Sequence, residues 1–435
     1  MLRISLFLFS VGLLAVPLVA LPIPSSDKDG SGAYATGNYR NLFAEAGHSK
    51  TEIFTKIDTA FQQLFQGNPE TESVFFPAGK NAQGPLAYVT DWANHDVRTE
   101  GMSYGMMIAV QMDKKAEFDA LWNWAKTYMY ISDPKHPSFG YFSWSCKTDG
   151  TPNEETAAPD GEEYFVMSLY FAANRWGSGK GIYDYKAQAD ELLHAMRHRA
   201  VMSGPTRFGP RTVGNEVDEA TKMIRFVPGV DRGNFTDPSY HLPAFYELWA
   251  RWGPAEDRDF WAEAATVSRD FFLKTTNLKT GLTPAYANFD GTPHATGFPQ
   301  SSIFGYDSWR TASNWSVDWS WWRKAPQEQM LSDRIQVFFR AQGLSDYGDL
   351  YTLEGKRWQA DSSPQSSPHT PSHSSTGLVA TNAVASLAAA DPKSKDFVKA
   401  LWEAPVPSGQ GRYYDGMLYL MSLLHCSGEF RIWKP

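Results

Sequence analysis

The sequence predicts an all-α fold in which helical hairpins close into a ring. Apolar residues recur at intervals of three and four along most of the 435-residue chain, which is the spacing of amphipathic helices. Glycine, proline and aspartate interrupt this pattern and divide it into about a dozen helices that come in pairs. Strand-like alternation is confined to short pieces between helices. An inner ring of apolar helices and an outer ring of amphipathic ones suits this count.

The expected helices begin with TEIFTKIDTAFQQLFQG, where Ile53, Ile57, Phe61 and Phe65 form a stripe four residues apart. The stretch GEEYFVMSLYFAANRWG opens with acidic residues and closes at Gly177, as a helix start and stop do. The other helical stretches are KKAEFDALWNWAKTYM, DYKAQADELLHAMRHRA, SYHLPAFYELWARWG, FWAEAATVSRDFFLKT, NWSVDWSWWRK, MLSDRIQVFFRAQG, GLVATNAVASLAAA and YYDGMLYLMSLLHC.

The start of the chain predicts secretion. Residues 1–20 combine Arg3, an apolar run and Ala20 near a plausible cleavage point, which indicates a signal peptide and an extracellular protein. A polar segment follows over residues 21–38, and residues 39–435 are expected to form one domain. No later segment is apolar enough to cross a membrane.

The Ser/Pro-rich stretch from Ala360 to Gly377 is interpreted as a loop of that domain. It could also link to a binding module, but too few residues follow it for a usual separate domain, and these residues are strongly helical.

Composition disfavours a nucleic-acid-binding protein and is compatible with sugar binding. The formal net charge is −8 and there is no block of Lys or Arg, so nucleic acid is an unexpected partner. Aromatic residues make up 14% of the chain, with 16 Trp, and such residues serve in cores and in stacking on sugar rings. The two cysteines, Cys146 and Cys426, could form a disulfide or be separate buried thiols. No Cys/His pair has zinc-finger spacing.

The stretch DVRTEGMSYGMMIAV contains a lone carboxylate, Glu100, ahead of an apolar run. A helix N-terminus favours an acidic residue through its dipole, so capping alone would account for Glu100. However, Gly101, Gly105 and Ser103 leave one side of this helix almost bare, which indicates close approach by another helix or by a ligand.

Two further acidic residues stand in informative contexts. Asp160 precedes a helix with Glu162 and Glu163 in its first turn, where it can be a cap or a functional carboxylate. Asp318 lies inside a helix among Trp315 and other tryptophans. Aspartate is a poor residue for a helix interior, and a buried carboxylate needs partners or a chemical role. We therefore expect Asp318 to be functional.

Five motifs follow one another along the chain: RTEGMSYGMMIAV, PDGEEYFVMSLYFA, DPSYHLPAFYELWARWG, YDSWRTASNWSVDWSWW and RYYDGMLYLMSLL. Together they resemble glycoside hydrolase family 8, from about Asn41 to the C-terminus. The resemblance is closest to the xylan-active branch, including the reducing-end xylose-releasing exo-oligoxylanases. It implies an (α/α)6 barrel, in agreement with the helical hairpins, and therefore one (α/α)6 catalytic domain over residues 39–435.

The resemblance implies roles for four residues of an inverting glycosidase. Glu100 of TEGMSYG matches the general acid, and Asp318 of SVDWSWW matches the general base. Asp160 of PDGEEYF matches the carboxylate that binds and distorts the sugar at the cleavage point. Tyr240 of DPSYHLP matches the residue that helps to hold the attacking water. We expect the acid and base carboxyls to lie roughly 6.5–9.5 Å apart, with a water between them.

Aromatic residues should line the cleft and stack on sugar faces. Trp144, Trp315 and Tyr414 are the candidates, and each is equally compatible with a place in the core. Two sequons, at Asn234 and Asn314, are possible glycosylation sites. We expect Asn314 to be buried and unmodified, because it lies one turn from the proposed base.

Two other side chains are candidates for binding substrate. Arg310 can order the charge near Asp318 or simply pair with Asp307. In exo-acting members of the family a loop resembling Leu-His-Pro closes the cleft, and the matching stretch here is centred on His373 between two serines. A histidine there could hydrogen-bond the terminal sugar, or it could be one polar residue in a Ser/Pro loop.

These observations predict a secreted, monomeric, inverting enzyme that needs no metal or cofactor. It should cleave β-1,4-xylosidic bonds in xylo-oligosaccharides or xylan and release xylose from the reducing end. An endo-1,4-β-xylanase and a family 8 endoglucanase or chitosanase are the alternatives. A non-catalytic sugar-binding protein is disfavoured because neither Glu100 nor Asp318 is lost.

Overall fold

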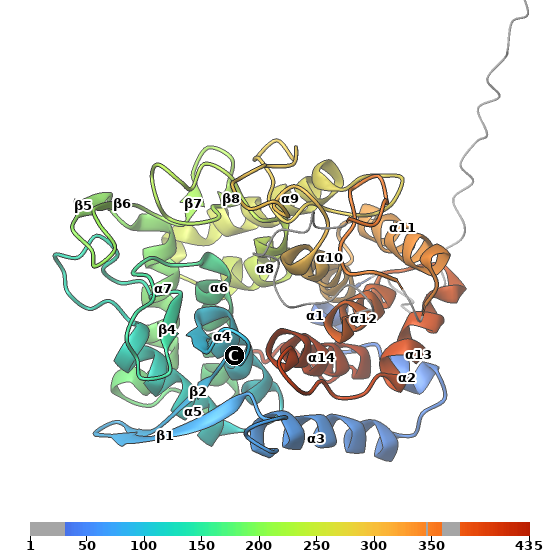
Figure 1. The fold of residues 1–435 in the computed structure, drawn as a ribbon, viewed down its shortest axis with the longest axis horizontal. Coiled ribbons are helices and arrows are strands. Elements are labelled where there is room, and N and C mark those ends of the chain that lie inside the picture. The colour runs from blue at the N-terminus through green and yellow to red at the C-terminus, as the bar shows by residue number, and fades with distance from the viewer. Residues whose placement is uncertain (1–30, 345–346, 359–374) are drawn as a thin grey trace, which may run out of the picture.

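The computed structural model describes residues 31–344, 347–358 and 375–435. The predicted signal peptide, His373 and most of the Ser/Pro-rich stretch lie outside these residues. The predicted all-α class is confirmed, because α-helices dominate the described chain (Figure 1).

The helices follow the apolar periodicity of the sequence closely. In chain order they are α1 (Ala33–Thr36), α2 (Leu42–Glu45), α3 (Lys50–Gln66), α4 (Thr99–Gln111), α5 (Lys115–Trp124), α6 (Pro159–Trp176), α7 (Tyr185–His198), α8 (Pro243–Trp252), α9 (Arg258–Thr275), α10 (Trp309–Trp322), α11 (Gln327–Gln342), α12 (Thr376–Val384), α13 (Lys395–Glu403) and α14 (Arg412–Ser427). The sequence analysis missed α13, whose apolar positions Phe397, Val398 and Leu401 are all buried.

In the described part of the chain, six pairs of inner and outer helices, five of them hairpins, close into the ring that the sequence predicted. The inner helices α4, α6, α8, α10, α12 and α14 surround the centre of the molecule, and each contacts one outer helix, α5, α7, α9, α11, α13 and α3 respectively (Figure 1). The ring closes where α14 contacts both α4 and α3. Inner and outer helices differ in burial: in α4 every residue except Glu100 is buried, whereas α3 buries one stripe of apolar residues.

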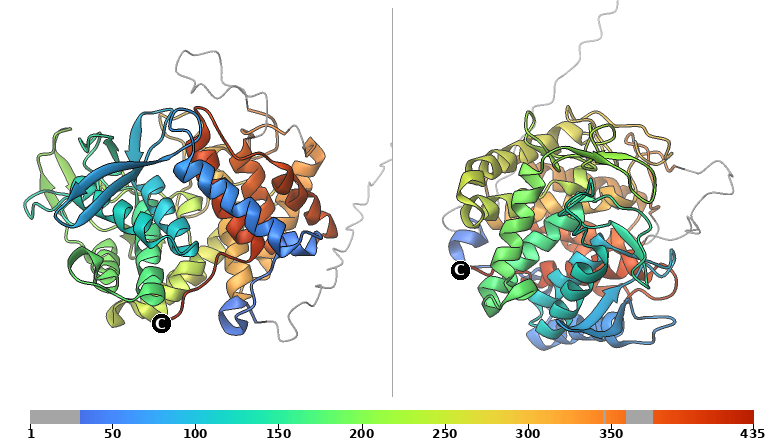
Figure 2. Two further views of the ribbon diagram at one scale, coloured as in Figure 1. Left: turned by 90° about the horizontal axis from the view of Figure 1, so that it is seen from below. Right: turned by 90° about the vertical axis from the view of Figure 1, so that its left-hand side faces the viewer.

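Within the residues that the structure describes, short strands occur between the helices, in four two-stranded antiparallel sheets. The longest pair is β1–β2, and it lies at the end of the molecule opposite α1 and the C-terminus (Figure 2). The strands are β1 (Phe75–Asn81), β2 (Gly84–Val89), β3 (Asp96–Arg98), β4 (Ser145–Lys147), β5 (Met202–Gly204), β6 (Arg211–Val213), β7 (Val217–Asp218) and β8 (Met223–Ile224).

The polar segment ahead of the domain is partly built into it. Within residues 31–38, Ala33 is buried, and the ring of Tyr34 stacks on Trp322 with centroids 4.4 Å apart. The C-terminal end of α10 is therefore covered by the N-terminal segment.

The two cysteines are buried and unpaired, Cys146 in β4 and Cys426 in α14. Of the two readings open from the sequence, the structure favours separate thiols over a disulfide. Within the described residues, no helix has both the length and the apolar character needed to cross a membrane.

A tight contact between inner helices joins the starts of α4 and α6. A Cβ placed on Gly161 would lie 2.4 Å from both Cβ and Oγ1 of Thr99, far inside van der Waals contact. The backbone of Thr99 cannot easily retreat, because its amide donates to the Trp144 carbonyl at 2.9 Å. Glycine at position 161 therefore sets how closely the first two inner helices approach.

We expect Gly161→Ala to lower the free energy of unfolding by about 1–3 kcal/mol, because overpacking here outweighs alanine's better helix propensity. Denaturant unfolding would measure the change. Gly297→Ala is the matched control, since no atom lies within 4 Å of its added Cβ. Equal effects of the two changes would contradict the role assigned to Gly161.

Candidate active site

The starts of the inner helices meet at one end of the ring. Glu100 lies in the first turn of α4, Asp160 in the first turn of α6, Arg310 in the first turn of α10 and Tyr413 in the first turn of α14. Their side chains are connected by hydrogen bonds and ion pairs. Because the start of a helix carries partial positive charge, this convergence favours carboxylates at this end of the barrel.

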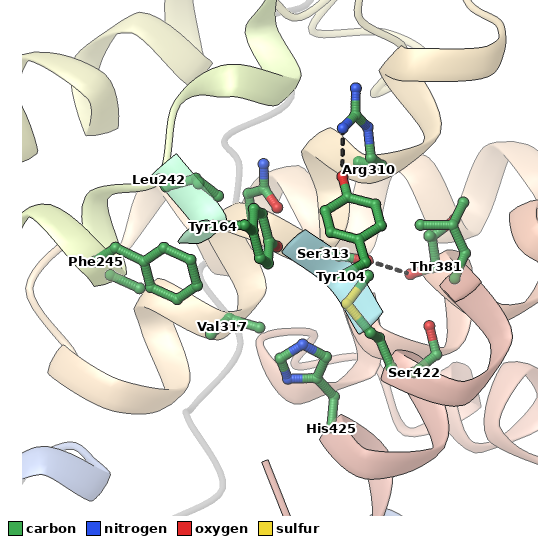
Figure 3. A pocket seen from close by; sticks show the side chains of 14 residues that line it. Tyr104, Tyr164, Leu242, Phe245, Arg310, Ser313, Val317, Thr381, Ser422 and His425 are labelled. Atoms are coloured by element: carbon green, nitrogen blue, oxygen red, sulfur yellow. Dashed lines mark hydrogen bonds between the residues drawn. The ribbon is translucent and has the colours of Figure 1, made fainter. Parts of the chain in front are cut away.

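Arg310 is the centre of the cluster. Its Nη1 donates to Oδ2 of Asp160 at 2.9 Å and forms an ion pair with Oε2 of Glu100 at 3.4 Å. Its Nη2 donates to Oδ1 of Asp307 at 2.9 Å. Nη1 also donates to the hydroxyl of Tyr104, as Figure 3 shows. One buried guanidinium therefore holds three carboxyl groups from three segments of the chain. The sequence-based alternative that Arg310 pairs with Asp307 is confirmed.

Glu100 has the properties of a proton donor. Burial raises its pKa to about 7; Arg310 opposes this rise, and the charges of Asp160 and Asp307 add to it. The hydroxyl of Tyr413 donates to Oε1 of Glu100 at 2.8 Å and fixes the direction of the carboxyl group. A carboxyl with this pKa is largely protonated in mildly acidic solution.

Asp160 lies deeper in the cluster than Glu100. Burial raises its pKa, while the charge and hydrogen bond of Arg310 lower it. Its Oδ1 also accepts the amide of Gly161 at 2.9 Å. Both oxygens of Asp160 are therefore held in place.

Asp307 is a candidate site residue that the sequence analysis did not propose. It lies in a 3-10 helix, η5 (Tyr306–Ser308), immediately before α10. Its side chain is 32% exposed, against 15% for Glu100 and 6% for Asp160, so it is the most water-accessible carboxyl bound to Arg310. The signal in the sequence was its spacing three residues before Arg310, which places the two side chains on one face of a helical turn.

Asp318 does not belong to this cluster, and its predicted place opposite Glu100 is wrong. Its side chain is fully buried, and its two oxygens accept from Nε and Nη2 of Arg269 in α9, at 2.7 and 2.8 Å. Eight residues separate it from Arg310, about two turns and 12 Å along α10. Arg269 in turn binds Glu247 at 2.8 Å. Asp318 thus forms a structural ion pair with Arg269 that joins the inner and outer rings of helices.

The remaining predicted residues divide between the cluster and the core. Tyr240 is buried near the cluster, with its ring 5.9 Å from the Arg310 guanidinium. Tyr414 is half-buried and donates to the carbonyl of Tyr306 at 3.2 Å. Trp144 is also half-buried and faces the guanidinium of Arg98.

Trp315 is fully buried, so its predicted role in stacking on substrate is wrong. Its indole donates to Ser332 in α11 at 2.8 Å, which places it between the two rings of helices. Asn314 is buried as expected, and its amide donates to the Ser239 carbonyl at 2.7 Å.

The small residues of α4 make room for neighbouring side chains of the protein. A Cβ on Gly101 would lie 2.4 Å from the ring of Tyr413, and a Cβ on Gly105 would meet Leu121 and Val89 at 2.9 and 3.0 Å. Of the two possibilities open from the sequence, close approach by another element is the one observed. The close approach at Gly101 still bears on the site, because it lets Tyr413 reach Glu100.

A cavity lies inside the ring, behind Arg310 (Figure 3). Its lining comes from all six inner helices or their starts, with Tyr104 and Arg310 at one end and His425 at the other. Burial lowers the pKa of His425 to about 3, so this end of the cavity is uncharged at neutral pH.

Among the described residues, one group of side chains has spacing suited to a metal ion: His194, His198 and Asp257. It lies in α7 and η4 (Ala255–Asp257), which contribute nothing to the Arg310 cluster. Oδ1 of Asp257 already accepts from Arg197 and lies 2.5 Å from Nε2 of His198.

A protonated acid and a water-accessible carboxylate, held by one guanidinium at the mouth of an (α/α)6 barrel, define a glycosidase of the two-carboxyl type. Comparison with known proteins agrees with this class. The family model for glycosyl hydrolases family 8 matches residues 87–428, and the chain belongs to that family.

The most similar proteins include enzymes of xylan breakdown. The reducing-end xylose-releasing exo-oligoxylanase Rex8A of Paenibacillus barcinonensis is 43% identical over 93% of this chain and 99% of its own. A reducing-end xylose-releasing exo-oligoxylanase of Halalkalibacterium halodurans is 42% identical over 94% of this chain and 98% of its own. A catalytic mutant of a xylanase from Teredinibacter turnerae, solved with xylohexaose, is 53% identical with a TM-score of 0.89, covering 93% of this chain and all of that one.

We expect Asp318→Asn to lower the free energy of unfolding by about 3–5 kcal/mol, because it removes one of the two carboxylates that bind the buried Arg269. Denaturant unfolding would measure this loss, and the protein that remains folded should keep its turnover. Glu403→Gln, which breaks an exposed pair with Lys399, is the control and should change stability little. If the variant lost turnover but kept its stability, Asp318 would have a catalytic role.

Proposed function

We propose that this protein is an inverting hydrolase of β-1,4-xylosidic bonds in xylo-oligosaccharides or xylan. The observation that carries the reaction type is the Arg310 cluster, in which a carboxyl with a pKa of about 7 and a more exposed carboxylate bind different nitrogens of one guanidinium. The substrate class is supported by the relatives, which include exo-oligoxylanases and a xylanase bound to xylohexaose.

Glu100 acts as the general acid in this proposal. It gives its proton to the glycosidic oxygen as the bond breaks, so it must enter the reaction protonated. Its burial supplies that state, and the hydrogen bond from Tyr413 occupies Oε1, which leaves the second oxygen to carry the proton to the glycosidic bond.

Asp307 replaces Asp318 as the proposed general base. It must be ionised and reachable by water, and it has both the greatest exposure of the three carboxyls and a hydrogen bond from a permanent cation. Binding to the other end of the guanidinium keeps it apart from Glu100 and leaves room for a water on the far side of the sugar. Tyr240 is proposed to help hold that water, and Asp160 to bind the sugar at the cleavage point.

The mode of attack has two candidates, each with an observation in its favour. Release of xylose from the reducing end is supported by the curated exo-oligoxylanases, which match nearly the full chain. Internal cleavage is supported by the higher identity, 53%, to the xylanase that binds xylohexaose. The predicted blocking residue, His373, lies outside the described residues, so the mode rests on product analysis.

Secretion and a monomeric state remain part of the proposal. The signal-like pattern of residues 1–20 supports the first. Expression of the full chain with a C-terminal tag should give processed protein in the medium, and deletion of residues 1–20 should retain it in the cell. Light scattering of the purified protein should give the mass of one chain.

Activity should fall as pH rises through about 7, because Glu100 ionises there and can no longer give a proton. Glu100→Gln should lower turnover of xylohexaose by a factor of about 10²–10⁴, with little change in binding. The pH dependence of kcat/KM and calorimetric titration would measure these effects. If kcat/KM fell with rising pH at a midpoint well below 7, or if the variant kept near-normal turnover, Glu100 would not be the general acid.

Asp307→Asn should abolish hydrolysis of xylohexaose, because it removes the base. The midpoint of denaturant unfolding should match that of the wild type, because asparagine still offers Arg310 a neutral hydrogen-bond partner. In the wild-type protein, proton NMR at early times should show the α-anomer as first product of the β-linked substrate. A β-anomer would indicate a retaining enzyme. Substantial turnover by the variant would mean that another group activates the water.

Xylopentaose labelled at its reducing end would decide the mode of attack. A cleft closed one sugar beyond the cleavage point should place the label almost wholly in xylose and leave polymeric xylan nearly uncut. An open cleft should spread the label over xylobiose and xylotriose and should cut polymeric xylan rapidly. Cello- and chito-oligosaccharides are the controls for substrate class, and faster cleavage of either would overturn the xylan proposal.

A further inference from the structure

The hydroxyl of Tyr246 in α8 lies within hydrogen-bond distance of two acceptors. It is 2.6 Å from Oε1 of Glu163 in α6 and 2.9 Å from the carbonyl oxygen of Tyr240, and all three residues are buried. A tyrosine hydroxyl carries one proton, and a carbonyl oxygen only accepts. Both contacts are therefore hydrogen bonds only when Glu163 is protonated, so that Glu163 donates to Tyr246 and Tyr246 donates to Tyr240.

The surroundings of Glu163 agree with a neutral carboxyl group. It is fully buried, and among the described residues no Lys, Arg or His lies within ion-pair distance of it. Burial raises its pKa well above the usual range. The charged and titratable groups that act on it are Asp160 on its own helix, Arg310 on α10, Asp237 ahead of α8 and Glu216 ahead of β7, together with Tyr246 itself.

The charges around Glu163 favour the proton as well. Asp160 disfavours a further negative charge nearby, and burial also raises the pKa values of Asp237 and Glu216 well above their usual range, so neither of them supplies a charge that would offset that of Glu163. Arg310 is the one opposing cation, and its Nη atoms are already occupied by Asp160, Glu100 and Asp307. An ionised Glu163 would thus be a buried anion without a cationic partner, which is costly.

Tyr240 depends on this hydrogen-bond chain. It ends the 3-10 helix η3 (Pro238–Tyr240), just before α8, and its amide donates to the Asp237 carbonyl at 3.0 Å. The bond from Tyr246 ties the Tyr240 carbonyl to α8, so it sets the backbone from which the Tyr240 ring extends toward Arg310.

We propose that Glu163 is a positioning residue that works as a neutral acid, holding Tyr240 over the reacting centre through Tyr246. This inference rests on the role proposed for Tyr240 in holding the attacking water. When Glu163 ionises, it becomes an acceptor and takes the only proton of the Tyr246 hydroxyl, so the Tyr240 carbonyl loses its donor. The effect should fall on turnover, because the water is used in the chemical step and contributes little to binding the sugar.

Infrared spectroscopy tests the protonation state without any substrate. The difference spectrum between wild type and Glu163→Gln, taken in mildly acidic buffer, should contain the C=O stretching band of a protonated carboxylic acid. Appearance of carboxylate bands in its place would overturn the proposal. This readout is independent of which glycan the enzyme cleaves, so it stands even if xylo-oligosaccharides are not hydrolysed.

Kinetics of three variants test the positioning role on any substrate that the wild type hydrolyses. Tyr246→Phe removes the donor to Tyr240 and should lower kcat about tenfold with KM nearly unchanged. Glu163→Gln keeps a donor to Tyr246 and should retain kcat within about twofold, a conservative rescue that a requirement for negative charge would not allow. The matched control is Tyr170→Phe in α6, which removes a hydroxyl that donates to Asp190 in the outer helix α7, and it should leave kcat unchanged.

Two kinetic results would overturn the proposal. In one, Glu163→Gln loses as much kcat as Tyr246→Phe, which would show that the carboxylate form is needed. In the other, Tyr246→Phe alters only the free energy of unfolding, as the Tyr170 control is expected to do. If the wild-type protein hydrolyses no xylo-oligosaccharide, the proposed function fails instead, and the infrared result still decides the state of Glu163.

Discussion

The active site depends on a single buried cation that is shared by three carboxyl groups. Arg310 cannot neutralise Glu100, Asp160 and Asp307 together, and burial makes an excess of negative charge expensive. Protonation of one carboxyl group is the least costly way to lower this excess of negative charge. Glu100 is the furthest of the three from the guanidinium and has a pKa of about 7. Burial, reinforced by the excess of negative charge around Arg310, thus gives Glu100 the raised pKa that a general acid requires.

The barrel supplies the rest of the constraint. Because the inner helices begin at one end of the ring, side chains that are distant in sequence reach the same guanidinium, and Tyr413 from the last helix can contact Glu100 from the first inner one. Gly161 and Gly101 allow these contacts because they carry no side chain at the points where Thr99 and the aromatic ring of Tyr413 approach. Packing density and acid–base chemistry are therefore linked, since a wider ring would lengthen each of these contacts.

Two buried charged residues of α10, Arg310 and Asp318, form ion pairs in different parts of the structure. Arg310, in the first turn of this helix, faces the cluster, whereas Asp318 faces Arg269 in the outer ring. Tryptophans surround Asp318 because it lies between two layers of helices. The same surroundings would suit a sugar cleft, so the local sequence could not separate a structural aspartate from a catalytic one. The family likeness was right, but the structure places Asp318, the acid predicted as base, against Arg269 and Asp307 against Arg310.

The sequence by itself determined the all-α class, the order of most helices, the pairing into a ring and the place of Glu100 and Asp160 at helix starts. These follow from periodicity and capping, which are local properties. Only the tertiary structure decided that Asp307 joins Glu100 at Arg310, that Asp318 and Trp315 belong to the packing between rings, and that Tyr413 approaches Glu100. The physical reason is that these outcomes depend on which face of a helix turns inward and on distances between segments far apart in the chain. The pKa of a buried carboxyl follows from the charges that those distances bring together.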